Sequence, residues 1–397
     1  MSLTPRLLLM LSLFAICLLQ IGCSSSSSSN TPVLPERIIF TGIGTHGIFD
    51  PAITRDPSNG RLWMSYSAVD PSLSWPTQNY DVVSTRLAYS TNYGSSWTDS
   101  GTVVNAVLDV TLPRTAPNAG TWINEVSQLI YDPGAVAGER WKLMWHHYLL
   151  INGTRSFVDG WIALKMASTP EGLAAATEIK LFGAYLYDAA NNTAGGTTLS
   201  PVGGAPLIQL NTALDAALNT CVFSEPGMYA TNDALYLSML CVHIPDINRQ
   251  IVLFKCSSPC NTGSASSWTY LGTALQASDA AALGFDTGFS APGLFEAGGA
   301  VNLVVTPVQT SDAPWPDYYS GCRIFRFANL DTAQLQTTGA QPTLIDSVNG
   351  TTGSFNGACT YHTSASYSGM LYSELNTSVT DRFQIYKSHN NCSLLGN

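Results

Sequence analysis

Three carboxylates differ from the other acids of the sequence in where they occur. Asp50, Glu125 and Glu225 lie in apolar segments with the character of strands, whereas an acid such as Asp56 lies in a turn sequence. An ionised carboxylate is costly to bury, so an acid inside such a strand indicates a purpose other than packing. Carboxyl groups held close together can serve as general acid and general base. For Asp50, which precedes a proline, a turn cap is the structural alternative.

The composition limits the classes of protein to which the chain can belong. Of its 397 residues, 45% are hydrophobic and only 11% are charged. This argues against intrinsic disorder and against a coiled coil. The net charge of −10 and a pI near 4.9 give no basic surface for phosphates, so nucleic acid is excluded as an expected partner.

The elements that must position the three acids come from a repeated pattern. A short apolar segment, a Gly/Asn/Asp/Pro turn and further alternating strands recur five times, beginning near residues 49, 125, 223, 289 and 359. Four-stranded sheets that cannot bury both faces alone close most naturally into a ring. The sequence therefore predicts an all-β fold, a five-bladed β-propeller, with residues 37–41 as an outer strand that closes it. A β-sandwich with insertions is the alternative.

The N-terminus has the pattern of an export signal. Arg6 precedes an apolar run that is shorter than the roughly 20 residues of a membrane-spanning helix. Its end, Ile21-Gly22-Cys23, resembles the lipobox of bacterial lipoproteins. This predicts a signal peptide at 1–22, a lipid anchor on Cys23, a Ser-rich tether at 23–36 and the propeller domain at 37–397. The expected location is the cell envelope, in the outer membrane or at the cell surface. A secretory signal without lipidation is the alternative.

Export changes the interpretation of the cysteines. Of the 9 cysteines, Cys17 lies in the signal and Cys23 is the expected lipid anchor, which leaves an odd number, seven. In an oxidising compartment these favour disulfides, and one thiol is left over. A hairpin with its turn at 231–232 would place Cys221 and Cys241 opposite each other. Cys256 and Cys260 are close enough to close a small loop.

Two motifs carry resemblances to known families. Ser90-Thr-Asn-Tyr-Gly-Ser-Ser-Trp97 resembles the Asp-box turn of sialidase-type propellers, with Asn in place of Asp. Phe49-Asp50-Pro51 and Ser224-Glu225-Pro226 are similar to the inner-strand motifs of five-bladed glycoside hydrolases of family 43 and its relatives. That resemblance implies Asp50 as general base and Glu225 as general acid of an inverting hydrolase, with Glu125 as a third acid that tunes them. Such a pair works at a separation of about 6.5–9.5 Å. Alignment of the prolines puts Ala291 at the equivalent position of the next unit and leaves Glu125 one residue off.

Further residues are expected to line the central funnel. We expect Trp75, Trp122, Trp315 and His46 to contact a sugar, since they precede or begin strands. His362 resembles the position at which family members hold a channel metal, often calcium. A buried His bonded to backbone is the alternative. No cofactor is expected to be required beyond such a structural Ca²⁺.

Two functions remain open on the sequence alone. The first is an exported, lipid-anchored glycoside hydrolase that acts on a polysaccharide or oligosaccharide. The second is a non-catalytic propeller lipoprotein that binds glycans or partner proteins at the cell surface. In both, the chain is expected to be a monomer, with carbohydrate as its main partner and the membrane reached through the N-terminal lipid. Fold alone does not decide between them, because propellers host many functions.

Overall fold

The structure is a computed structural model of the 397-residue chain. It describes residues 35–43, 47–70, 82–109, 120–151, 154–183, 187–188, 193–194, 207–219, 221–243, 248–308, 319–349, 356–363, 368–375 and 383–388. Residues Val33–Asn397 form one compact unit, and the predicted signal peptide lies outside the described residues. Among the helices that are described, none combines the length and the apolar composition needed to cross a membrane.

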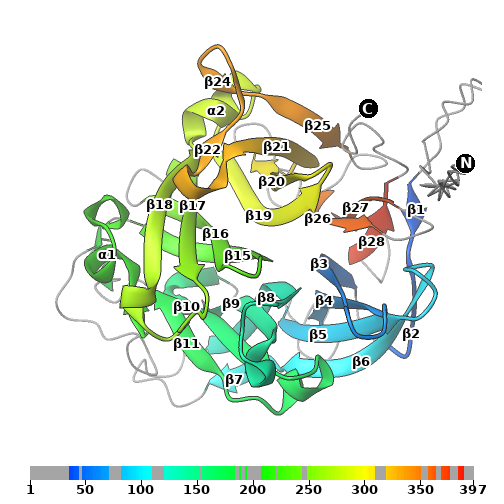
Figure 1. Cartoon of the computed structure of the whole chain (residues 1–397). Helices are drawn as coiled ribbons and strands as arrows, with labels where there is room; N and C mark the ends of the chain where they lie inside the picture. Colours follow the sequence, from blue (N-terminus) through cyan, green and yellow to red (C-terminus); the bar gives the residue numbers. More distant parts are fainter. Residues whose placement is uncertain are drawn as a thin grey trace, which may run out of the picture. The chain divides into compact units, whose positions relative to one another are not determined.

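Five antiparallel sheets follow one another along the chain and surround a common centre (Figure 1). Blade 1 contains β3 (Ile48–Arg55), β4 (Leu62–Val69), β5 (Val83–Ser90) and β6 (Ser96–Val104). Blade 2 contains β8 (Gly120–Tyr131), β9 (Trp141–Ile151), β10 (Thr154–Ala167) and β11 (Ile179–Gly183), with β7 (Val107–Asp109) and β14 (Ile208–Gln209) at its two edges. Blade 3 contains β15 (Cys221–Ala230), β16 (Ala234–His243), β17 (Asn248–Ser257) and β18 (Trp268–Leu275).

Blade 4 contains β19 (Gly288–Ala297), β20 (Ala300–Val308) and β21 (Cys322–Asn329), with β25 (Leu344–Val348) and β22 (Gln334–Leu335) both paired to β21. Blade 5 contains β26 (Asn356–Thr363), β27 (Ser368–Leu375) and β28 (Phe383–Lys387). The minor elements are β12 (Tyr187–Asp188), β13 (Thr193–Ala194), β23 (Thr337–Thr338), β24 (Gln341–Pro342), α1 (Leu210–Ala213) and α2 (Ala277–Ala282). The predicted all-β, five-bladed propeller is therefore confirmed, and each predicted inner segment is the first strand of a blade.

The N-terminal strands close the ring. Strand β1 (Glu36–Arg37) pairs with β28 and becomes the outer strand of blade 5, and β2 (Ile39–Thr41) pairs with β6 of blade 1. Between them, the Ile38 N–H donates to the carbonyl of Ile385 at 3.0 Å. Residues 36–41 therefore join the first blade to the last, as the sequence predicted for this segment.

Apolar clusters between neighbouring blades hold the ring together. One such cluster contains Leu62 and Tyr66 of blade 1 with Leu371 and Ile385 of blade 5. Separate clusters fill the interfaces between blades 1 and 2, 2 and 3, 3 and 4, and 4 and 5. Because each sheet buries both faces against its neighbours, few charges are needed inside, which agrees with the low charged fraction of the sequence.

Each inner strand carries the same local distortion. Its pairing with the second strand shifts register once, at a β-bulge. At each bulge one residue has left-handed backbone: Asp50 (φ 52°), Val126 (φ 50°), Glu225 (φ 53°), Ala291 (φ 46°) and Ala358 (φ 49°). Such backbone is unfavourable for residues with a Cβ and persists only where its surroundings hold it.

At three of the five bulges, hydroxyl groups on the preceding blade hold the distorted backbone. The bulge N–H donates to a side-chain oxygen of the second strand: Val126 to Ser67 Oγ at 3.1 Å, Ala358 to Thr306 Oγ1 at 2.8 Å and Asp50 to Ser373 Oγ at 2.8 Å. A buried N–H needs an acceptor, so these contacts fix both the bulge and the packing of one blade on the next.

Among the described residues, three disulfides add covalent links to blades 3, 4 and 5. Two of them, Cys221–Cys241 and Cys256–Cys260, confirm the predicted pairs, and Cys322–Cys359 joins β21 to β26 across two blades. The predicted register of the first pair is wrong. Cys221 lies opposite His243, so the disulfide connects diagonal neighbours whose Cα atoms are 5.1 Å apart. Cys392 lies outside the described residues.

The ring-closing segment gives a test of the fold. Ile38 is 5% exposed, whereas its neighbour Ile39 is 59% exposed. We expect Ile38→Ala to lower the free energy of unfolding by about 2–5 kcal/mol, because it leaves a cavity between the first and last blades. Ile39→Ala is the matched control and should change it by less than about 0.5 kcal/mol. Thermal and urea unfolding followed by circular dichroism measure both, and equal effects of the two variants would contradict this account of closure.

Candidate active site

Asp50 occupies the bulge of β3 and is 6% exposed. Its Oδ2 atom accepts a hydrogen bond from the Ser67 hydroxyl at 2.7 Å and another from the Val126 N–H at 3.2 Å. The first donor comes from the next strand of the same blade and the second from blade 2. The position of Asp50 in the backbone and its carboxylate are therefore both fixed by contacts between strands.

Glu225 occupies the same position on β15 of blade 3. It is half-buried, and its Oε2 atom accepts a hydrogen bond from the Ala291 N–H of blade 4 at 2.6 Å. Asp50 and Glu225 thus share a feature: the carboxylate of each accepts the bulge N–H of the following blade. The alignment by proline predicted that Asp50, Glu225 and Ala291 are equivalent, and the shared bulge confirms it.

Glu125 lies one residue before the bulge of β8, where Val126 takes the position equivalent to Asp50. It is nevertheless buried, at 5% exposed, and its Oε1 atom accepts a hydrogen bond from the Tyr148 hydroxyl at 2.7 Å. The one-residue offset predicted from the sequence is real. The carboxylate still lies close enough to Asp50 to affect its ionisation.

The three acids interact electrostatically. Burial raises the pKa of the Asp50 carboxyl to about 8, and the negative charges of Glu125 and then Glu225 add to the increase. The hydrogen bond from Ser67 and that from the Val126 N–H act in the opposite direction, because they stabilise the carboxylate. Asp50 therefore retains a proton near neutral pH. Carboxyl groups that lie close together and perturb each other's pKa values are what general acid–base chemistry needs.

The other predicted site residues lie apart from this cluster or beyond the described residues. Trp122 is 8% exposed and stacks on His147 with ring centroids 4.7 Å apart, which leaves little of its face for a sugar. His46, Trp75, Trp315 and Cys23 lie outside the described residues. His362 lies on β26, an inner strand as predicted, but its side chain is outside what the structure describes.

Ser67 and Tyr148 are site residues that sequence reasoning missed. Both are buried on second strands, and each donates a hydrogen bond to one of the acids. A signal for Ser67 exists in the sequence: the pair Tyr66-Ser67 recurs as Tyr372-Ser373 at the same point of blade 5. A hydroxyl repeated within an otherwise apolar strand indicates a buried acceptor or donor.

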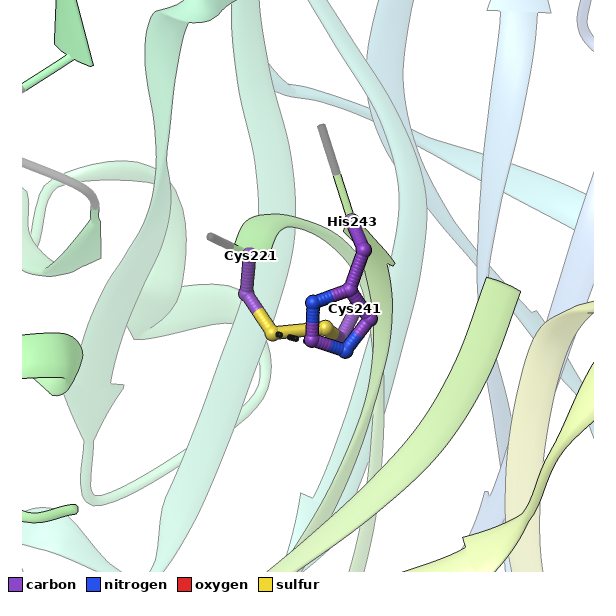
Figure 2. A group of neighbouring side chains, drawn as sticks. All are labelled: Cys221, Cys241 and His243. Atoms are coloured by element: carbon purple, nitrogen blue, oxygen red, sulfur yellow. Dashed lines mark hydrogen bonds between the residues drawn. A yellow bond between two sulfur atoms is a disulfide. The ribbon is translucent and has the colours of Figure 1, made fainter. Parts of the chain in front are cut away.

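Three residues of kinds that can bind a metal ion lie close together where β15 begins and β16 ends. Cys221, Cys241 and His243 bring their sulfur and nitrogen atoms within 4.8 Å of one another (Figure 2). The two sulfurs are bonded to each other, however, and zinc is bound by thiolates. In this oxidised form the group is a disulfide beside an imidazole, and it supplies no metal site.

Similarity to known proteins is found in the structure and not in the sequence. No protein-family model matches the chain, and no curated protein matches its sequence. Among solved structures, a thermostable family-43 glycoside hydrolase aligns with a TM-score of 0.51 and 14% identity over 89% of this chain and 92% of that one. The fold is that of the propeller glycoside hydrolases. The family 32 β-fructofuranosidase of Bombyx mori aligns with a TM-score of 0.50 and 11% identity over 89% of this chain, which spans 61% of that protein.

The raised pKa of Asp50 predicts how stability depends on pH. The folded state holds a proton that the unfolded chain releases near pH 4, so stability falls as pH rises from about 4 to about 8. Asp50→Asn removes this titration. We expect its unfolding free energy, relative to wild type, to increase by at least about 1 kcal/mol between pH 5 and pH 8.5. Urea unfolding at both pH values measures this, with the exposed turn variant Asp233→Asn as control. A constant difference for Asp50→Asn would contradict the raised pKa.

Proposed function

We propose that the chain is a glycoside hydrolase that cleaves a polysaccharide or oligosaccharide with inversion of configuration. The observation that carries the proposal is the coupled set of three inner-strand acids on three consecutive blades, in a propeller whose structural neighbours are glycoside hydrolases. A sequence with only 11% charged residues has no structural need for three acids at one end of its inner strands. Hydrolysis of a glycosidic bond requires such a set.

In this mechanism, Glu225 is the general acid and Asp50 the general base. Glu225 transfers its proton to the leaving oxygen as the bond from that oxygen to the anomeric carbon breaks. A water molecule on the opposite face forms the new bond to that carbon and gives a proton to Asp50. The catalyst is restored when Asp50 releases this proton to solvent and Glu225 takes one up.

The proposed roles require the proton of the cluster to move from Asp50 to Glu225, because burial raises the pKa of Asp50 to about 8. Asp50 must be ionised to accept a proton, and the two donors at its Oδ2 atom favour that form. With the proton on Glu225, one negative charge near Asp50 disappears and the pKa of Asp50 falls, because interacting groups titrate together. The charge of Glu125, which accepts a hydrogen bond from Tyr148, adds to the raised pKa of Asp50.

Export and anchoring complete the proposal. The export-signal pattern of the N-terminus supports a location outside the cytoplasm, with the propeller attached to the cell envelope by acyl chains on Cys23 and separated from the lipid by the Ser-rich segment. A hydrolase of this kind would meet polymeric carbohydrate that does not enter the cell. Carbohydrate is then the main partner of the protein.

The acid assignment is tested by substrates that differ in leaving group. Glu225→Gln should lower kcat/KM on a polysaccharide or an aryl glycoside with a poor leaving group by about 100- to 10,000-fold. It should affect a dinitrophenyl glycoside much less, since that leaving group needs no proton. Asp50→Asn should lower both equally, and the exposed Glu296→Gln should lower neither. Turnover unaffected by Glu225→Gln rejects the assignment, and glycan affinity without turnover in wild type favours a binding propeller.

The anchor has its own test. When the full chain is expressed in a bacterium, the protein should fractionate with membranes and incorporate labelled palmitate. Cys23→Ser should abolish the label and release the protein from the membrane fraction, because no acyl chain can then be attached. Membrane association that persists in Cys23→Ser would contradict lipidation at this residue.

A further inference from the structure

The second strands of blades 1 and 3 differ at the position that is paired with the residue before the acid. In blade 1, Ser67 is paired with Phe49, the residue before Asp50. In blade 3, the residue paired with Ser224, immediately before Glu225, is Leu240. Asp50 and Glu225 are equivalent bulge residues, so Ser67 and Leu240 occupy the same register position on the second strands of their blades.

The Ser67 hydroxyl bonds two groups at once, the Asp50 carboxylate and the Val126 N–H. It donates to Asp50 Oδ2 at 2.7 Å, and the same oxygen accepts the Val126 N–H at 3.1 Å. Because the N–H occupies the acceptor side of the oxygen, the hydroxyl hydrogen is directed at the carboxylate. A donor fixed in this way stabilises the ionised carboxyl more than the neutral one.

Leu240 has no hydroxyl to offer. It is buried in the apolar cluster between blades 3 and 4, together with Phe289 and Val305. The bulge N–H of the next blade, which a hydroxyl receives in blades 4 and 5, is here received by the Glu225 carboxylate itself.

We propose that Ser67 is a positioning residue that fixes the Asp50 carboxylate in place and favours its ionised form, through a hydroxyl that blade 3 replaces with Leu240. The inference rests on the proposed function and deepens it, since it names a residue of this chain that acts on the proposed base.

The charged surroundings of Asp50 are the same in every variant needed to test this. Glu125 on β8 and Glu225 on β15 act on it directly. The strands β27 and β28, which also pack against β3, carry Glu374 and Lys387, and Lys387 is paired with Glu36 at 2.8 Å. His362 lies on β26 with its side chain outside the described residues. Substitution of Ser67 or Leu240 removes none of these groups.

The test is the pH profile of kcat/KM. Ser67→Ala should move the acidic limb, which reports ionisation of the base, upward by about one pH unit, because the carboxylate loses a hydrogen bond to its charged form. Ser67→Thr retains a hydroxyl, as Thr306 does in blade 4, and should restore the limb. Thr306→Val removes an equivalent acceptor whose donor, the Ala358 N–H, belongs to none of the acids, so it should lower stability without moving the limb. An unmoved limb in Ser67→Ala overturns the proposal.

Leu240→Ser tests the same effect in blade 3. The new hydroxyl would lie at the register position of Ser67 and should move the basic limb downward relative to Leu240→Ala, which loses the same packing without gaining a hydroxyl. Coincident limbs in these two variants would contradict the effect assigned to a hydroxyl at this position. If Leu240→Ser does not fold, the Ser67 variants still decide the proposal.

A measurement without substrate separates this inference from the proposed function. In urea unfolding, the pH range over which wild type loses stability should move upward in Ser67→Ala and return in Ser67→Thr. If no glycoside is turned over by wild type but this shift is found, the hydrolase proposal fails and the effect of Ser67 on Asp50 stands. If turnover is found without the shift, the role assigned to Ser67 fails alone.

Discussion

The hydrogen bonds that join bulge N–H groups to acceptors on the preceding blade, at Asp50, Val126, Ala291 and Ala358, are the interactions on which the rest of the structure depends. A residue with φ near +50° turns its amide out of the ladder of its own sheet, and a buried amide without an acceptor is costly. At these four positions the acceptor comes from the neighbouring blade, so the bulge fixes how the two sheets pack. The strain of the left-handed residues is thereby balanced by contacts that also set the order of the ring. Ring closure by residues 36–41 then makes the set of contacts continuous.

The candidate site contains the same kind of hydrogen bond between blades. At Asp50 and Glu225 the acceptor of the next bulge N–H is a carboxylate, so the side chains proposed for chemistry also join blade 1 to blade 2 and blade 3 to blade 4. This has two consequences. Each carboxylate accepts a backbone N–H from the neighbouring sheet, and such fixed donors are the kind of positioning catalysis requires. Removal of either acid also removes a contact between blades, and the amide variants keep an oxygen that can accept it.

The repeat was readable from the sequence because its strands alternate and its turns contain Gly, Asn, Asp and Pro, and the prolines after Asp50 and Glu225 marked equivalent positions. The bulge itself was not readable, since Val126 has no proline after it and no sequence preference for left-handed backbone. The one-residue offset of Glu125 from the position of Asp50 was predicted, but its hydrogen-bond partner Tyr148 was missed. Trp122 was expected at a mouth because it begins a strand, yet it is buried against His147, because pairing of β7 with β8 extends the sheet beyond it. Hydrogen bonds between strands distant in sequence decide these details, and no local pattern encodes them.

The distribution of acids around the ring follows from the same equivalence. Blades 1, 2 and 3 contribute Asp50, Glu125 and Glu225, whereas blades 4 and 5 have Ala291 and Ala358 at their bulges. Ala291 still donates its N–H to Glu225, so blade 4 serves the site through its backbone although it adds no charge. The three acids thus lie on three consecutive blades, and the pKa of Asp50 is raised by burial, then by Glu125 and then by Glu225. In blades 4 and 5 the hydroxyls of Thr306 and Ser373 accept bulge N–H groups, so there the equivalent positions serve the packing of the blades and add no charge.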